Sequence, residues 1–231
     1  MLSLSFSGKR LTGGSDHEYA WKTIPTNGGG MAFVGFSDSN DGDVSNNHGE
    51  TDLWVAKTDG TGNIEWSKLY GGTGIDEGYD IIQTSDGGFM VAGYTESTDG
   101  DVTGHHGTYD GDFWLLKLNA SGGIVWNKCF GGTYDEEASA MVQSTDGNFF
   151  IAGETSFTDG DVSGLHGSYV DIWVIKTDAS GNLLGQKCIG GTDYDEGIGL
   201  AATSDNGCIV CGRTSSSDGD AVGYHNGSDK L

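Results

Sequence analysis

Residues 71–130 read GGTGIDEGYDIIQTSDGGFMVAGYTESTDGDVTGHHGTYDGDFWLLKLNASGGIVWNKCF, and this stretch is one complete copy of a tandem repeat. Two phrases recur along the chain with spacings of 58, 60 and 59 residues. They are a Gly-Gly-Ser/Thr triplet, which starts at Gly13, Gly71, Gly131 and Gly190, and an Asp-Gly-Asp triplet, which starts at Asp41, Asp99, Asp159 and Asp218. Self-similarity at a fixed period is typical of a repeat architecture.

Four segments of this repeat have the composition of β-strands. Residues 79–84, 89–95, 113–118 and 124–130 are rich in β-branched and aromatic side chains and are bounded by Gly, Asp, Asn and Ser. Four antiparallel strands repeated radially form the blade of a β-propeller. The sequence therefore predicts an all-β fold, a β-propeller of four-stranded antiparallel blades built from four repeats of about 59 residues. A stacked solenoid is the alternative, although solenoid repeats are usually shorter.

The repeats divide the chain into one predicted domain, residues 1–231. Its repeats span residues 13–70, 71–130, 131–189 and 190–231. Residues 5–12 align with the fourth strand of a repeat (63–70), whereas the fourth repeat stops where its third strand is due. We expect residues 1–12 to close the ring by supplying a strand, which removes an exposed sheet edge. A fragment of a longer array, or a strand donated to the next subunit of a filament, are the alternatives.

The chain is strongly acidic, with a formal net charge of −23 and a pI near 4.2. Such a field repels phosphate groups, so nucleic acid and anionic membranes are excluded as expected partners. Cations or a cationic protein surface are favoured, unless the acidity serves only solubility. No run approaches 18 apolar residues, so no membrane insertion is expected. The first residues do not resemble a secretory leader, so either the protein is intracellular or a leader is missing from the sequence.

The four cysteines are expected to be buried free thiols. Cys208 and Cys211 are three residues apart in a predicted strand, so their side chains point to opposite faces. Cys129 and Cys188 occupy equivalent positions in adjacent repeats, too far apart for a disulfide. A single CxxC does not make a zinc site.

The alternation of strand direction predicts that two acidic motifs emerge at the same end of every blade. One is the long loop that carries DGDV, and the other is the connection that carries GGT and DEG. The acidic pairs of this connection are expected near the central mouth; they are Asp76-Glu77, Glu136-Glu137 and Asp195-Glu196, with Glu18-Tyr19 in the first repeat. Any ligand is therefore expected at this acidic loop face.

The Asp-Gly-Asp loops suit a hard cation such as Ca²⁺, which prefers six to eight oxygen ligands. A third aspartate recurs just before the third strand of each repeat. The predicted metal ligands are Asp41, Asp43, Asp52, Asp99, Asp101, Asp112, Asp159, Asp161, Asp171, Asp218, Asp220 and Asp229. The alternative is a plain Asx-type turn, because Asp-Gly is also a common turn former.

A histidine follows each of these loops at a fixed position, as His48, His106, His166 and His225. An Asp/His pair can perform acid–base chemistry, but a site repeated four times in one chain is a poor design for catalysis. The structural interpretation, in which each histidine anchors its long loop, is preferred. The recurrent tryptophans of the third and fourth strands are expected to dock one blade on the next, although an exposed ring stack could bind sugars.

The motif string GG[ST]…DEG…QTSDGGF.VAGYT…DGDV.G.HG…D.W resembles the repeats of about 60 residues found in secreted and surface-anchored bacterial proteins. The resemblance covers essentially the whole chain. It implies a β-propeller in an extracellular or cell-surface protein, with a non-catalytic binding or structural role. Residues 57–66 also look slightly like quinoprotein propellers, but no quinone site carries over, because the third repeat lacks the tryptophan.

Three functional hypotheses follow. The first is a non-enzymatic extracellular module for binding, adhesion or assembly, with Ca²⁺ stabilising its acidic loops and with a protein or glycan partner at the acidic face. The second is a structural subunit that self-associates into a filament or coat by exchanging residues 1–12. The third is a glycan hydrolase or lyase, which needs one defined pair of carboxylates; here acidic pairs recur in every repeat, so none is marked as catalytic.

Overall fold

The structure is a computed structural model that describes residues 12–107 and 110–222. The described residues form fourteen strands and no helix. The strands are β1 (Glu18–Pro25), β2 (Met31–Ser37), β3 (Asp52–Thr58), β4 (Ile64–Tyr70), β5 (Asp76–Gln83), β6 (Phe89–Thr95), β7 (Asp112–Leu118), β8 (Ile124–Phe130), β9 (Glu136–Gln143), β10 (Phe149–Thr155), β11 (Asp171–Thr177), β12 (Leu183–Ile189), β13 (Asp195–Ala202) and β14 (Cys208–Thr214).

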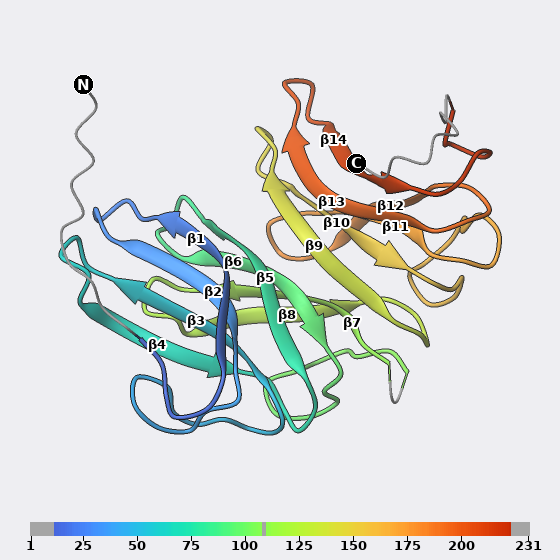
Figure 1. Cartoon of the computed structure of the whole chain (residues 1–231). Helices are drawn as coiled ribbons and strands as arrows, with labels where there is room; N and C mark the ends of the chain where they lie inside the picture. The colour runs from blue at the N-terminus through green and yellow to red at the C-terminus, as the bar shows by residue number, and fades with distance from the viewer. Residues whose placement is uncertain (1–11, 108–109, 223–231) are drawn as a thin grey trace, which may run out of the picture. The chain divides into compact units, whose positions relative to one another are not determined.

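The strands form one antiparallel sheet per repeat (Figure 1). Three sheets have four strands in the orders β1-β2-β3-β4, β5-β6-β7-β8 and β9-β10-β11-β12, and the fourth contains β13 and β14. The predicted all-β fold with four-stranded antiparallel repeat sheets is therefore confirmed for the first three repeats. The described residues do not make four complete blades or a closed ring. The predicted closing strand, residues 1–12, lies almost entirely outside the described part of the chain.

The chain divides into two compact units, each with its own core. Unit 1 contains residues 12–105 and 114–129 of the described chain. Its core includes Val34, Leu53, Phe89 and Trp114, all with no exposed surface. In this unit β5 lies so close to the first sheet that a Cβ on Gly78 would lie 2.4 Å from Val34 Cγ2. Only glycine therefore permits this approach of one sheet to the next.

Unit 2 contains residues 106–107, 110–113 and 130–222 of the described chain. Its packing includes the rings of Phe113 and Trp173, whose centroids are 4.7 Å apart. A second cluster joins Phe150 of β10 to half-buried side chains of β13 and β14 such as Val210. The two sheets of unit 2 are thus held together by apolar side chains, as are those of unit 1.

The first strand of each sheet, here termed the innermost strand because the predicted blade would place it there, begins earlier than the sequence predicts. The prediction placed the acidic pairs in a connecting loop and started the strand at residue 79. Instead β5, β9 and β13 begin at the first acidic residue, and β1 begins at Glu18. Asp76, Glu136 and Asp195 are buried, and each accepts a hydrogen bond from a backbone N–H of the preceding connection. Glu18 is half-buried. The prediction that the acidic pairs lie in a connecting loop is therefore wrong.

Each innermost strand also contains a β-bulge at the same place. The pairing of β1 with β2 skips Trp21, and that of β5 with β6 skips Tyr79. In unit 2 the skipped residues are Ser139 and Ile198. Bulges re-aim a side chain relative to the sheet, so they frequently accompany binding sites.

The cysteine prediction holds in part. Cys129 and Cys188 are buried free thiols, and Cys208 is half-buried. Cys211 is exposed, which corrects the expectation that all four are buried. The reason is that Cys211 points to the face of β14 opposite Cys208, where the described chain places no further sheet. The described residues include no helix long and apolar enough to cross a membrane.

Candidate functional site

Each Asp-Gly-Asp phrase forms a tight turn against the Gly-Gly pair that begins the same repeat. The central glycine has a positive φ in all four repeats, 66° at Gly42, 65° at Gly100, 54° at Gly160 and 62° at Gly219. A Cβ on Gly100 would lie 2.3 Å from the carbonyl oxygen of Gly71. The next backbone N–H, that of Asp101, donates to this same oxygen at 2.9 Å. The glycine is therefore required by both the turn and the close approach.

The first aspartate of each phrase accepts hydrogen bonds from the Gly-Gly-Ser/Thr segment. Asp99 Oδ1 accepts from the backbone N–H of Thr73 at 2.8 Å, and Asp159 and Asp218 do the same for Thr133 and Thr192. In the first repeat Asp41 accepts from the N–H of Ser15. These are the contacts of a turn anchor, one of the two roles expected for this residue.

In each of the first three repeats the buried third aspartate pairs with a partly exposed histidine. Asp52 Oδ2 accepts from the backbone N–H of His48 at 2.8 Å and lies 2.6 Å from its Nδ1. The same arrangement joins His106 to Asp112 and His166 to Asp171. The geometry agrees with a histidine that anchors its loop. His225 and Asp229, the predicted counterparts in the fourth repeat, lie outside the described residues.

A second buried carboxyl group faces each third aspartate across the boundary between repeats. A Cβ built on Gly71 would lie 2.3 Å from Asp76 Oδ2 and 2.7 Å from Asp52 Oδ1, so both oxygens flank one point above this glycine. Asp76 accepts from the side chains of Thr95 and Ser97 and from the N–H of Gly72. Unit 2 repeats the arrangement twice, as Glu136 with Asp112 beside Gly131 and as Asp195 with Asp171 beside Gly190.

Burial raises the pKa of four of these carboxyl groups, those of Asp52, Asp76, Glu136 and Asp171. It raises the pKa of Asp76 to about 6, against the hydrogen bonds that it accepts. Burial likewise raises the pKa of Glu136 to about 8, with the nearby charge of Asp112 adding to the effect. The pKa values of Asp52 and Asp171 are also raised, chiefly by desolvation. Two carboxyl groups that share one buried site do not both ionise near neutral pH.

The predicted metal ligands separate into two kinds of position. The first and second aspartates lie in exposed or half-exposed turns, whereas the third is fully buried against a histidine. Within residues 12–107 and 110–222, no group of three or more His, Cys, Asp or Glu side chains is arranged to hold a metal ion. Calcium binding therefore stays a prediction from the sequence.

The second aspartate instead faces the histidine of the preceding repeat. In unit 2, Asp161 Oδ2 lies 3.9 Å from His106 Nε2. In unit 1, Asp101 and His48 line a cavity of about 500 Å³ together with Lys68 and Tyr70. The Tyr70 hydroxyl donates to the carbonyl of Gly122 at 2.6 Å, which fixes one wall of this cavity. Its size is that of a small-ligand site, and its lining is mainly polar.

Tyr19, Glu77, Glu137 and Glu196 belong to the predicted acidic pairs, but the sequence did not single out their partners on the neighbouring strand. One cross-strand pair lies next to the acidic residue that begins the first strand of every sheet, and its members differ between repeats. The pairs are Tyr19 with Phe36, Glu77 with Tyr94, Glu137 with Glu154, and Glu196 with Arg213. The adjoining positions recur with little change, because the next residue of β2, β6, β10 and β14 is serine or threonine and the preceding one is glycine. The signal in the sequence was this variation inside an otherwise regular repeat.

In unit 2 these variable residues gather around a small pocket of about 60 Å³. Glu137 and Glu154 line it with Glu196 from the next repeat. The Tyr194 hydroxyl donates to Glu154 at 2.8 Å, and Arg213 binds Glu196 at 2.5 Å while it lies over the Tyr194 ring, 5.4 Å from its centroid. An arginine side chain is thus held by one carboxylate and one aromatic ring.

Comparison with known proteins identifies no family. No family model matches the chain, and no curated protein matches it. Among solved structures, it is similar to the 1.35 Å crystal structure of a protein of unknown function from Bacteroides caccae, with 14% sequence identity and a TM-score of 0.47. The match covers 84% of this chain and 53% of that one, so the chain spans about half the length of the matched structure.

Proposed function

We propose that the chain is a non-catalytic binding module whose repeats display variable side chains on the outward face of their innermost strands. The observation that carries the proposal is the cross-strand pair beside the acidic residue that begins the first strand of each sheet. This pair is aromatic in the first repeat, Glu with Tyr in the second, Glu with Glu in the third and Glu with Arg in the fourth, while the adjoining glycine and Ser/Thr positions change little. The formal charge of −23 favours a cationic protein as the partner. We also propose that the repeats form a ring of blades and that the protein is extracellular or lies at the cell surface. Both follow from the sequence resemblance.

Burial of the paired carboxyl groups supports a non-catalytic role. A glycan-active enzyme needs two carboxyl groups that flank a substrate bond. Asp52, Asp76, Asp112 and Glu136 have no exposed surface, and Asp171 has none either. A sugar cannot reach these oxygens, and each of the five carboxyl groups accepts at least one hydrogen bond within the fold.

The test is binding of the whole chain to probes of different charge. We expect a 12-residue peptide of alternating arginine and serine to bind, with an affinity that falls as salt is raised, because exposed charge pairs are screened. A matched glutamate–serine peptide and the uncharged oligosaccharide maltohexaose are expected not to bind. Binding of maltohexaose, or of no probe at all, contradicts the cationic-partner proposal.

A pair of charge-matched variants locates the binding surface. Glu137→Gln with Glu196→Gln removes two carboxylates from the pocket in unit 2. Glu50→Gln with Asp193→Asn removes two charges from exposed loop positions. The first variant is expected to weaken peptide binding several-fold and the second to leave it nearly unchanged. Equal effects would mean that only net charge matters, which would overturn the role of the innermost strands.

A second candidate function is self-assembly by strand addition. Within the described residues β14 pairs with β13 alone, and an unpaired strand edge is a template for another strand. Deletion of residues 1–12 separates the possibilities, with thermal unfolding and light scattering as measurements. A ring that is closed by these residues loses stability on deletion. A filament subunit stays folded and loses polymerisation, and no change in either property would rule out both forms of strand exchange.

A further inference from the structure

Four aromatic rings form a continuous cluster on unit 1. Tyr19 and Trp21 of β1 are stacked, with centroids 6.2 Å apart and planes inclined by 20°. Tyr19 also stacks on Phe36, its partner across the strands, at 5.0 Å. Trp21 meets Tyr79 of β5 at 6.1 Å. Both β1 and β5 contribute their bulge residue, so the bulges bring the first two repeats together at this cluster.

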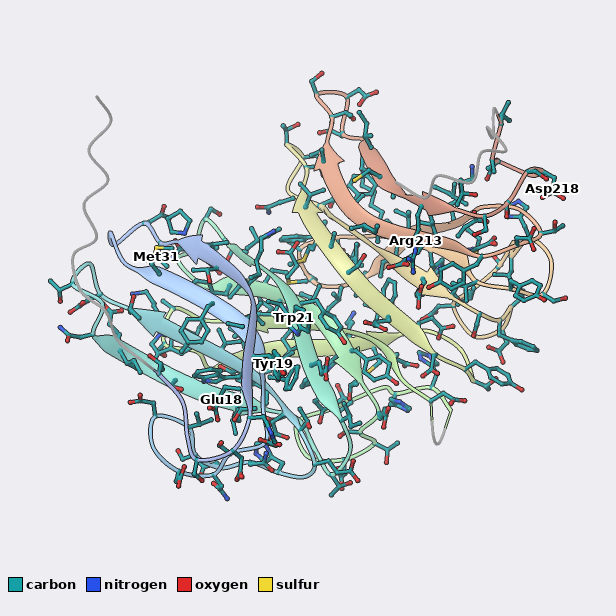
Figure 2. The ribbon with its side chains drawn as sticks, in the orientation of Figure 1. Glu18, Tyr19, Trp21, Met31, Arg213 and Asp218 are labelled. Carbon is teal, nitrogen blue, oxygen red and sulfur yellow. The ribbon has the colours of Figure 1, made fainter. Side chains whose placement is uncertain are left out.

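The cluster is open to solvent, unlike the packing around the buried tryptophans. Tyr19 is 54% exposed and Trp21 is 56% exposed, and both project from β1 (Figure 2). Trp54, Trp114 and Trp173 are buried, and Trp66 and Trp126 are half-buried. Trp21 is therefore the most exposed of the six tryptophans. Exposed rings that are already stacked lose little side-chain entropy when a ligand covers them.

The groups at the rim of the cluster are mainly acidic. The Tyr79 hydroxyl donates to Glu77 Oε2 at 2.7 Å, which holds this carboxylate beside the rings. Lys22, the residue after Trp21, lies 3.4 Å from Asp80, so its charge is already partly balanced. Glu18 accepts from the Ser37 hydroxyl at 3.0 Å. Rings with a carboxylate at their edge attract a cation through both the ring quadrupole and the charge.

The fourth repeat shows how this chain holds a cationic side chain at the equivalent place. Arg213 occupies the position of Phe36 and Glu196 that of Tyr19 in their strand pairs. The Arg213 guanidinium is bound there by the Tyr194 ring and the Glu196 carboxylate. In the first repeat both paired positions are aromatic, and the described residues supply no guanidinium or ammonium group over those rings.

We propose that the Tyr19–Trp21 ring pair, with Glu77 at its edge, binds an arginine or lysine side chain of a partner protein. This inference rests on the proposed binding function and assigns one contact of it to unit 1. A cation is favoured over a sugar because the rim offers carboxylate acceptors in a strongly acidic molecule. In the fourth repeat one ring and one carboxylate hold the Arg213 guanidinium in a comparable way.

The experiment uses the whole chain and the arginine–serine peptide, followed by tryptophan fluorescence and calorimetry. Binding is expected to change the fluorescence mainly of Trp21, since the other tryptophans are covered or half-covered. The double variant Tyr19→Ala with Trp21→Ala is expected to weaken binding about fivefold, because each exposed cation–π contact contributes modestly. The matched control is Tyr134→Ala with Phe157→Ala, a second exposed ring pair with centroids 4.5 Å apart in unit 2. The control is expected to bind as the parent chain does, and circular dichroism checks that both variants fold.

The outcomes separate this inference from the proposed function. If the peptide binds but the Tyr19/Trp21 variant binds equally well, the ring pair is not the site and the proposed function survives. If both ring variants weaken binding equally, exposed aromatic area rather than this cluster is responsible, and the inference fails. If maltohexaose binds and the Tyr19/Trp21 variant abolishes that binding, the cluster is a sugar platform and the inference is wrong. If no cationic peptide binds to the parent chain, the proposed function itself fails.

Discussion

The carboxyl groups of Asp52 and Asp76 meet above the Cα of Gly71, although they belong to consecutive repeats. Both are fully buried, and Asp52 Oδ1 has no hydrogen-bond partner among the described residues. A proton on either carboxyl group would remove the repulsion between two buried negative charges. The stability of the contact between consecutive repeats is therefore expected to depend on the protonation of Asp52 and Asp76.

The first prediction concerns the pH dependence of stability. The folded pKa of Asp76, about 6, and that of Glu136, about 8, lie above their ordinary values of 3.8 and 4.5. The folded state thus binds these protons more tightly, so their contribution is fully present below about pH 4 and is lost as pH rises to 6 and 8. We expect the Tm to fall by several degrees between pH 5.5 and 8.5. A Tm that rises over this range would contradict the buried-pair interpretation.

The exposed aspartates of the turns are expected to make the protein less stable as pH falls, which is the opposite trend. The Ser144 hydroxyl holds the pKa of Asp146 down at about 2, and hydrogen bonds likewise lower that of Asp205. Their contribution is present above the unfolded pKa and is lost as pH falls. The stability maximum is therefore expected at mildly acidic pH, and a titration of Tm from pH 2 to 9 locates it.

The second prediction concerns the fall in Tm between pH 6.5 and 8.5. Glu136→Gln replaces the acid with a neutral amide of the same shape, so it removes a group whose ionisation destabilises the fold at alkaline pH. We expect the drop in Tm between pH 6.5 and 8.5 to shrink in this variant. Glu137→Gln, one residue away on the exposed face, is the control and should keep the drop of the parent chain.

The third prediction tests the turn that docks on the Gly-Gly pair. Gly100→Ala is expected to destabilise the protein by about 3 kcal/mol, because it adds a clash with the Gly71 carbonyl to the strain of a positive φ. Gly104→Ala has the same strain, with a φ of 83°, but a Cβ there meets nothing within 4 Å. It should cost about 1 kcal/mol. Urea unfolding measures both, and equal losses would mean that the close approach is not required.

The fourth prediction compares two neighbouring histidines. His106→Ala removes a ring that lies 2.7 Å from the buried Asp112, so we expect a loss of about 1–2 kcal/mol in the free energy of unfolding. The ring of His105 makes no hydrogen bond with the described residues, and His105→Ala should cost less. If His105→Ala proves the more damaging change, the anchoring role of His106 is wrong.

The fifth prediction concerns the thiols. A maleimide reagent at pH 7.5 should label Cys211 rapidly, because it is exposed on β14. Burial raises the pKa of Cys188 to about 12 and covers its sulfur, so this residue should react only on unfolding. Mass spectrometry of digested protein identifies the labelled sites, and early labelling of Cys188 would show that its core opens readily.

Calcium binding is checked separately. If the predicted loops hold Ca²⁺, addition of EDTA lowers the Tm by several degrees and excess Ca²⁺ restores it. An unchanged Tm would leave Asp99, Asp159 and Asp218 as the turn anchors that their hydrogen bonds describe.

The repeat period made much of the fold predictable. The second, third and fourth strands of the complete repeat were placed within a residue of β6, β7 and β8, because their apolar runs are bounded by turn residues. The first strand was placed three residues late because a charged Asp-Glu pair is not typical of a strand start. Only the buried donors, such as the hydroxyls of Thr95 and Ser97, make Asp76 acceptable there.

The candidate site was harder to predict. The histidine anchors followed from a repeated spacing, which sequence shows directly. The aromatic cluster did not, because Tyr19, Trp21 and Tyr79 are brought together by bulges and by the packing of β5 against β1. The bulges and the packing of β5 against β1 depend on backbone geometry rather than on amino-acid composition.

The meeting of Asp52 and Asp76 has a consequence for cooperativity. Each repeat closes its own turn on its own Gly-Gly pair, but the buried acid pair needs side chains from two successive repeats. In a one-dimensional array, stability is a sum of intrinsic terms and nearest-neighbour coupling terms. Protonation acts on the coupling term, so mild acid is expected to make neighbouring repeats unfold together, and alkaline solution to let them unfold in separate steps.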